Sequence, residues 1–365
     1  MSESTSNGMI WSFFQAWNGS LGKRKDRILT PRQHIWASEL GGSYIDRYLK
    51  MTAVEPTNPP NMRSLRKFDA GNMWEGIAWF VLSRAGVLIN SQEWLEYQLP
   101  DMLSVTGKLD FLAGGKPDWQ KARSSVKEMS VNFGPFGEFI SRQSLAIIDY
   151  LSATYGNELK TLVLECKSVS SFMFDRYERT GKANPHHEAQ LMHYLLSKNL
   201  PEGHIIYICK DDCRMLEFPV FNTPDGNSPT MQMYKSDVEK MTHFIKNKIE
   251  PNKEELIIFS EDLGKFSSNW KVEYSGYLTK LYGFSEPEAY RALVDPKISS
   301  FNRGFSRLIL SETGGTTPTG KPIKLTDGNL SAVEEMKATF KDFDSYVKKA
   351  IELKKEGLLE TEVSE

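Results

Sequence analysis

The sequence predicts an α/β protein in which helices flank a central mixed β-sheet, and two kinds of segment lead to this expectation. Short apolar or alternating segments, typical of strands, occur at residues 104–112, 161–166, 204–209 and 215–220. Helices are expected at residues 31–50, after Pro31, at 69–85, whose apolar positions are those of an amphipathic helix, and at 186–198, after the cap Asn184-Pro185. Because the two kinds of segment alternate along the chain, we expect one α/β core.

The 365 residues are expected to fall into three parts. Residues 1–30 form a polar N-terminal arm, and residues 31–250 contain every predicted strand. Residues 116–160 separate the first two strands and read as an insertion with helical stretches. Residues 251–365 form a C-terminal helical extension. This extension has a loop or linker at 299–332, rich in Ser, Thr, Gly and Pro, and an amphipathic helix at 333–356.

The composition excludes several classes of protein. Hydrophobic residues make up 40% and charged residues 25%, as in ordinary globular proteins, and the net charge of −2 excludes a polycation that coats DNA. No apolar run reaches the roughly 18 residues needed to span a bilayer, so we expect no membrane partner. Three cysteines make no disulfide framework, and the N-terminus lacks the pattern of a secretory signal. These features predict a cytoplasmic protein.

Two predicted strands carry acidic residues at positions suited to metal chemistry. Glu165 and Lys167 end an apolar strand, and residues two apart on a strand point to the same side. The backbone carbonyl of Cys166 lies between them. Asp110, on a strand that ends in Gly114-Gly115, offers a second carboxylate. An ionised group at the end of a buried strand needs a partner, and Mg²⁺ or Mn²⁺ prefers such oxygen ligands.

The ordered motifs Gly107-x-x-Asp110, Glu165-x-Lys167 and Gln190-x-x-x-Tyr194 resemble those of the PD-(D/E)XK nucleases of the RecB type. This group includes the CRISPR-associated adaptation exonucleases and their phage-borne relatives. The resemblance covers roughly residues 35–250 and implies a restriction-endonuclease-like core. It also implies that Asp110 and Glu165 bind Mg²⁺ or Mn²⁺ and that Lys167 acts on the attacking water. Gln190 and Tyr194 would line the site and contact DNA.

The resemblance suggests one more ligand and leaves one choice open. In the lambda-exonuclease-like branch an upstream helix presents a Glu to the metal, and Glu75 is the matching residue here. The separation of 55 positions from Asp110 to Glu165 is wider than is usual in the family, so Asp149 and Asp118 are alternative ligands. Asp110 is preferred because of its preceding glycine, its alternating strand and the glycine turn that follows.

Other side chains receive weaker interpretations. Relatives with an iron–sulfur cluster use one early and three late cysteines, but this chain has none before Cys166 or after Cys213, so no such cofactor is expected. His186, His187 and His193 lie near Gln190 without a matching set of further ligands, and we expect them to be solvated.

The sequence therefore predicts a metal-dependent DNA nuclease, more specifically an exonuclease of replication, repair or recombination in a bacterial or phage-infected cytoplasm. A sequence- or structure-specific endonuclease of the same fold is an alternative. A third interpretation is a non-catalytic DNA-binding or scaffold protein. In that case the C-terminal helix would dock a helicase, a recombinase or a single-strand-binding partner.

Overall fold

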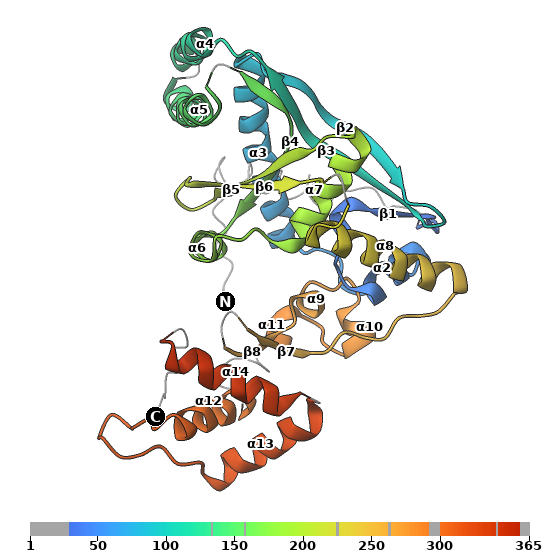
Figure 1. Cartoon of the computed structure of the whole chain (residues 1–365), viewed down its shortest axis with the longest axis vertical. Coiled ribbons are helices and arrows are strands. Elements are labelled where there is room, and N and C mark those ends of the chain that lie inside the picture. The colour runs from blue at the N-terminus through green and yellow to red at the C-terminus, as the bar shows by residue number, and fades with distance from the viewer. Residues whose placement is uncertain are drawn as a thin grey trace, which may run out of the picture. The chain divides into compact units, whose positions relative to one another are not determined.

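The computed structural model of the chain describes residues 29–357 except 133, 157, 224–225, 262–263, 292–299 and 341. Almost all of the expected N-terminal arm, residues 1–30, thus lies outside the described residues. The chain divides into two compact units. The first contains residues up to 54 together with 60–250, and the second contains residues 55–59 together with those from 251 onward (Figure 1). The short segment 55–59, expected in the core, therefore belongs to the second unit.

The first unit contains six strands, one 3-10 helix and seven α-helices among its described residues. In chain order these are β1 (His34–Trp36), η1 (Ala37–Glu39), α2 (Tyr44–Met51), α3 (Met62–Arg84), β2 (Leu88–Gln98), β3 (Ser104–Gly115), α4 (Trp119–Asn132), α5 (Gly134–Tyr155), β4 (Leu159–Val169), α6 (Ser171–Thr180), α7 (Pro185–Lys198), β5 (Glu202–Cys209), β6 (Met215–Phe221) and α8 (Pro229–Asn247).

These six strands form one mixed sheet in the order β1-β3-β4-β5-β6, with β2 also paired to β3. The pairs β1–β3 and β4–β5 are parallel, and β2–β3, β3–β4 and β5–β6 are antiparallel. Helices α2, α7 and α8 cover one face of the sheet, and α3, α4 and α5 cover the other (Figure 1). The expected α/β fold with a central mixed sheet flanked by helices is therefore confirmed.

Local sequence accounts for the ends of the helix that carries the Gln-x-x-x-Tyr motif. The side chain of Asn184 accepts a hydrogen bond from the backbone N–H of His186, and Pro185 occupies the first turn of α7. Asn199 ends the helix in the left-handed conformation with φ 51°. These signals are local, which is why this helix was predicted within one residue of its start.

Two expectations for the first unit need correction. Residues 31–50 are not one helical region, because residues 34–36 form β1 and pair with Ser104–Thr106 of β3. Pairing between segments so far apart in sequence overrides a local helical pattern. Strand β2, which was not predicted, contains Asn90, Ser91 and Gln92 at positions that interrupt the apolar alternation. The expected insertion is present as the helices α4 and α5, which pack together between β3 and β4.

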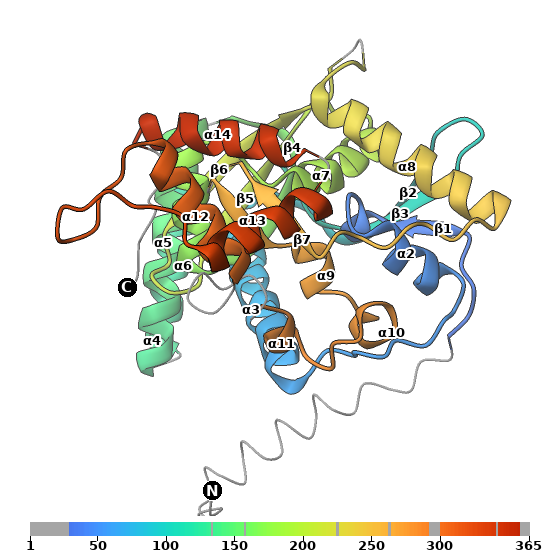
Figure 2. The ribbon, with the colours of Figure 1, turned by 90° about the horizontal axis from the view of Figure 1, so that it is seen from below.

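The second unit contains a two-stranded hairpin and short helices. Its elements are β7 (Ile257–Ser260), β8 (Lys265–Ser268), α9 (Trp270–Glu273), α10 (Leu278–Tyr282), α11 (Pro287–Arg291), α12 (Ser300–Glu312), α13 (Asp327–Thr339) and α14 (Phe343–Lys355). Helices α12, α13 and α14 lie against one another over an aromatic core centred on Phe266 (Figure 2). Across the described residues of both units, no helix is long and apolar enough to cross a membrane.

The C-terminal extension differs from its prediction in two ways. The expected loop at 299–332 contains α12, and the single helix expected at 333–356 is two helices. Phe340 ends α13 in an extended conformation (φ −109°, ψ 111°). This break lets Phe340 and Phe343 both stack on Phe266, with ring centroids 4.7 and 6.3 Å away. Aromatic packing in the core therefore outweighs the continuous helical pattern.

Candidate active site

The site forms where β3 changes partners along one edge. Strand β1 pairs with β3 at Ser104–Thr106, and the pairing of β4 with β3 begins at Phe111, opposite Leu164. In the gap between these two ladders, the Asp110 carboxylate accepts a hydrogen bond from the backbone N–H of Cys166, with Oδ2 2.9 Å from N. The side chain of Asp110 thus takes the place of a backbone partner where β4 leaves β3.

Glu165 and Lys167 occupy the same gap. Glu165 is completely buried, and the Lys167 ammonium lies 2.5 Å from its Oε1 atom while remaining about one quarter exposed (25%). Apart from this ion pair, neither carboxylate oxygen of Glu165 has a hydrogen-bond partner among the described residues. A buried carboxylate with unused lone pairs is costly, so the position is suited to an additional cationic partner.

The charges of these groups act on one another. Burial, and then the nearby Asp110 charge, raises the pKa of Glu165 to about 8, although Lys167 opposes this shift. Burial also raises the pKa of Asp110, against the opposing effects of Lys167 and the Cys166 N–H. Burial alone would lower the pKa of Lys167, but the charges of Glu165 and Asp110 raise it. Asp110 and Glu165 both resist ionisation because they are buried close together. A divalent cation bound between them is expected to favour the ionised form of both.

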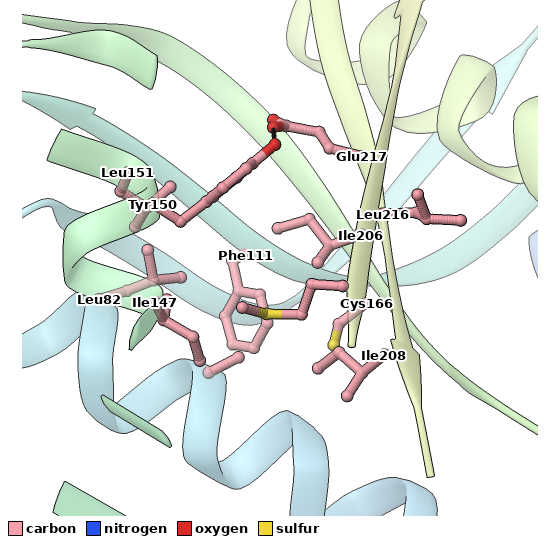
Figure 3. A pocket seen from close by; sticks show the side chains of 12 residues that line it. Leu82, Phe111, Ile147, Tyr150, Leu151, Cys166, Ile206, Ile208, Leu216 and Glu217 are labelled. Carbon is pink, nitrogen blue, oxygen red and sulfur yellow. Dashed lines mark hydrogen bonds between the residues drawn. The ribbon is translucent and has the colours of Figure 1, made fainter. Parts of the chain in front are cut away.

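The side chain of Cys166 points away from this gap. Its sulfur faces an apolar pocket on the opposite side of the sheet, lined by Phe111, Ile206 and Leu82 among others (Figure 3). Tyr150 of α5 closes the pocket by hydrogen bonding to Glu217 (Figure 3). Cys166 therefore presents its backbone, and not its thiol, to the site.

Glu75 approaches from α3 but is already engaged. A Cβ atom added at Gly71 would lie 3.5 Å from Ser168 Oγ, so α3 passes close to the end of β4, and Glu75 follows one turn later. Burial and the Asp110 charge raise the pKa of Glu75. Its carboxylate accepts a hydrogen bond from the side chain of Gln92, whose backbone is left-handed (φ 55°). A left-handed backbone is strained in a residue other than glycine, and residues in such strained conformations are frequent at functional sites.

The Gln-x-x-x-Tyr residues connect α7 to the gap. Gln190 Nε2 donates to the Tyr194 hydroxyl at 3.1 Å, and this hydroxyl donates to the backbone carbonyl of Lys108 at 2.9 Å. Both side chains are buried. Gly107 makes this contact possible, because a Cβ there would lie 2.8 Å from a Tyr194 ring carbon and 2.6 Å from the Ala37 Cβ. The structure therefore brings Gln190 and Tyr194 to the same gap as Asp110, as a support for its strand.

His187 is a site residue that the sequence interpretation missed. The Tyr207 hydroxyl accepts the backbone N–H of Asn184 at 3.0 Å and is hydrogen bonded to His187 Nδ1, 2.7 Å away. Tyr207 is paired with Lys167 across β4 and β5. Burial, and then the Lys167 charge, lowers the pKa of His187 well below its usual value, which favours the neutral ring.

The expectation that all three histidines are solvated was wrong. His193 is completely buried, and His186 hydrogen bonds through Nδ1 to the Leu40 carbonyl at 2.9 Å. One signal for His187 was available in the sequence, because it lies three and seven residues before Gln190 and Tyr194 on one helix face. Its hydroxyl partner on β5 was not visible there.

The alternative acids lie elsewhere. Asp149 is an exposed residue of α5 (63%) whose carboxylate binds the Arg123 guanidinium at 2.7 Å. The acids whose charges act on Glu165 are Asp110 and Glu75. Asp118 accepts the backbone N–H of Lys121 at the start of α4. The structure therefore corrects the alternative assignment of Asp149, and the long separation from Asp110 to Glu165 is the α4–α5 insertion.

The described residues contain no group of three or more His, Cys, Asp or Glu side chains that could hold a metal ion. The carboxylates that meet in the gap are the pair Asp110 and Glu165. Oxygen ligands from two carboxylates and one backbone carbonyl are nevertheless the donor set that Mg²⁺ and Mn²⁺ accept, with water completing the shell.

Comparison with known proteins gives little further information. No family model and no curated protein matches the chain. Among solved structures, the crystal structure of the protein SSO0001 is similar at 14% sequence identity, over 74% of this chain and 94% of that chain, with a TM-score of 0.39. A likeness this weak carries no argument about function.

Proposed function

We propose that this chain is a Mg²⁺- or Mn²⁺-dependent deoxyribonuclease of the PD-(D/E)XK type, with a restriction-endonuclease-like core formed by the first unit. One observation carries the proposal. Glu165 is fully buried, lacks hydrogen bonds for its carboxylate apart from its pairing with Lys167, and has its pKa raised by the charge of Asp110 on the neighbouring strand. If the Glu165–Lys167 ion pair were purely structural, the negative charge of Asp110, the second buried acid, would remain uncompensated.

The donor set in the gap fits a hard divalent cation. Asp110, Glu165 and the Cys166 carbonyl would hold it, and Glu75 would join them if its bond to Gln92 opened. Such a cation, when bound, neutralises charge on the phosphoryl group and lowers the pKa of a bound water.

The other residues of the gap have roles that follow from their contacts. The partly exposed Lys167 ammonium, anchored by Glu165, would orient the attacking water. His187, held through Nδ1 by Tyr207, would donate a hydrogen bond to a substrate phosphate when Nε2 carries the ring proton. The buried bond from Tyr194 to the Lys108 carbonyl would keep Asp110 at its position on β3. Groups held by such contacts lose little entropy when the substrate binds.

Cleavage of end-labelled linear DNA with Mg²⁺, Mn²⁺ or EDTA tests the activity. We expect degradation that EDTA abolishes, and we expect closed circular DNA to survive, because an exonuclease requires an end. Cutting of the circle would instead identify an endonuclease of this fold.

Lys167→Ala tests the role of the ammonium group. This variant should abolish Mg²⁺-dependent cleavage and leave DNA binding largely intact, because the metal ligands remain. Exposed Lys160 on the same strand provides a matched control, and Lys160→Ala should cleave like the wild type. A wild-type chain that binds DNA but cleaves none under any of these conditions would be a scaffold protein and would contradict the proposal.

A further inference from the structure

Two tryptophans meet on an exposed part of the sheet beside the gap. Trp36 ends β1 and pairs with Thr106, and Trp94 of β2 pairs with Lys108, so the two rings approach from opposite sides of β3. Their ring centroids are 5.3 Å apart at an angle of 50°. Trp94 is 59% exposed. An indole this exposed contributes little to the core, so its role has to be sought at the surface.

The position of Trp36 is fixed by its neighbours. The guanidinium of Arg32 lies 5.7 Å from the Trp36 ring centroid and forms an ion pair with Glu39. The ring of His34 meets Trp36 edge-on, with centroids 4.9 Å apart. These contacts hold one indole in place and leave Trp94 as the open surface.

The charge beside the indoles suits a nucleic acid strand. Lys108 lies opposite Trp94, is exposed, and forms no ion pair among the described residues. Its charge acts on both Asp110 and Glu75. Lys108 and Asp110 are two residues apart on β3, or about 7 Å along the strand. An aromatic surface and a free ammonium group thus adjoin the proposed cleavage site.

We propose that Trp36 and Trp94 form a stacking surface for an unpaired base adjacent to the scissile phosphate. This inference rests on the proposed nuclease function and specifies its substrate as DNA with a single-stranded end. Stacking on an aromatic ring requires the free face of a base, which a paired and stacked duplex does not present. Lys108 would meet the phosphate of the same nucleotide.

Fluorescence anisotropy of labelled DNA measures binding by the full chain. With EDTA present to prevent cleavage, it tests the stacking surface formed by Trp36 and Trp94. Trp94→Ala should weaken binding of an oligothymidylate about 5- to 150-fold, the range for loss of one stacked base, and leave a blunt hairpin duplex unaffected. Trp94→Phe should recover most of the affinity, since it keeps an aromatic face. Phe221→Ala removes a similarly exposed aromatic residue (51%) from β6, at the far edge of the sheet, and should change neither affinity.

Three results would overturn the inference. Trp94→Ala could bind oligothymidylate like the wild type, or it could lose both substrates equally. A loss of self-association on light scattering would instead make the tryptophans an interface between copies of the chain. In each case Mg²⁺-dependent cleavage by the wild type would still stand, whereas a wild type that neither binds nor cleaves DNA would remove the nuclease proposal as well.

Discussion

At the scale of single residues, the candidate site depends on one acid being fully buried. Glu165 accepts no hydrogen bond from the described residues beyond its pairing with Lys167, whereas Asp110 receives the N–H of Cys166 and Glu75 receives the Gln92 amide. The three acids are therefore not equivalent. Glu165 has the greatest need of a cation, and Glu75 has the least.

This difference predicts how two variants depend on the metal. Glu165→Gln should have no detectable cleavage at any Mg²⁺ or Mn²⁺ concentration. Glu75→Gln should cleave about 10- to 100-fold less at low metal, as expected for a supporting ligand, and should recover as the metal concentration rises. Titrating the metal in cleavage assays measures both effects. Exposed Glu96 on β2 provides the control, and an unchanged metal dependence of Glu75→Gln would place that residue outside the metal site.

At the scale of elements, the gap exists because β3 has different partners along one edge. The ladder with β1 stops at Thr106 and that with β4 starts at Phe111. The Lys108 carbonyl in between is satisfied by Tyr194 of α7. Helix α7 thus supplies a hydrogen bond to a strand of the sheet, and Gly107 leaves space for the Tyr194 ring.

Gly107→Ala should therefore disturb both stability and activity. The added methyl group collides with Ala37 and Tyr194, so the free energy of unfolding should fall by about 1–3 kcal/mol, as for other overpacked sites. Cleavage should fall as well, because the Tyr194 hydroxyl is displaced from β3. Urea unfolding and cleavage rates measure the two effects.

Gly76 of α3 is the matched control for this substitution. A Cβ there meets no atom within 4 Å, and alanine favours a helix interior over glycine by about 0.5–1 kcal/mol. Gly76→Ala should therefore be slightly stabilising. Equal effects of the two substitutions would show that Tyr194 does not need the space at Gly107.

At the scale of the whole molecule, buried His193 links stability to pH. Burial lowers the pKa of His193 to about 4, with a smaller opposing effect from the Leu95 backbone. The unfolded chain, with a pKa near 6.5, binds more protons than the folded chain between these values. The free energy of unfolding should thus fall as pH decreases from about 6.5 to 4, by a total of about 3 kcal/mol.

His193→Phe, which keeps an aromatic ring beside Tyr194 and Tyr234, isolates this contribution. The difference in unfolding free energy between wild type and variant, measured by urea titration, should change over this pH range and be constant above it. Other titrating groups cancel in the difference. A difference that is the same at pH 4 and pH 7 would show that His193 is not kept neutral by burial.

The sequence by itself determined the elements whose signals are local. The apolar run at β4, the cap and proline of α7, and the strands β5 and β6 were all expected at nearly their observed positions. The order of the motifs also singled out Asp110, Glu165 and Lys167, which the structure brings together. Spacing along a strand or helix fixes which side chains share a face, so these groupings need no knowledge of the fold.

Only the tertiary structure decided what depends on contacts between distant segments. The pairing of β1 with β3 turned part of an expected helical region into a strand, and packing on Phe266 divided another expected helix in two. The ion pair with Arg123 removed Asp149 from the candidates, and folding brought the Tyr207 hydroxyl of β5 into hydrogen-bond distance of His187. Burial and partner choice are properties of the packed chain, because the free energy of each group depends on neighbours that the linear order does not reveal.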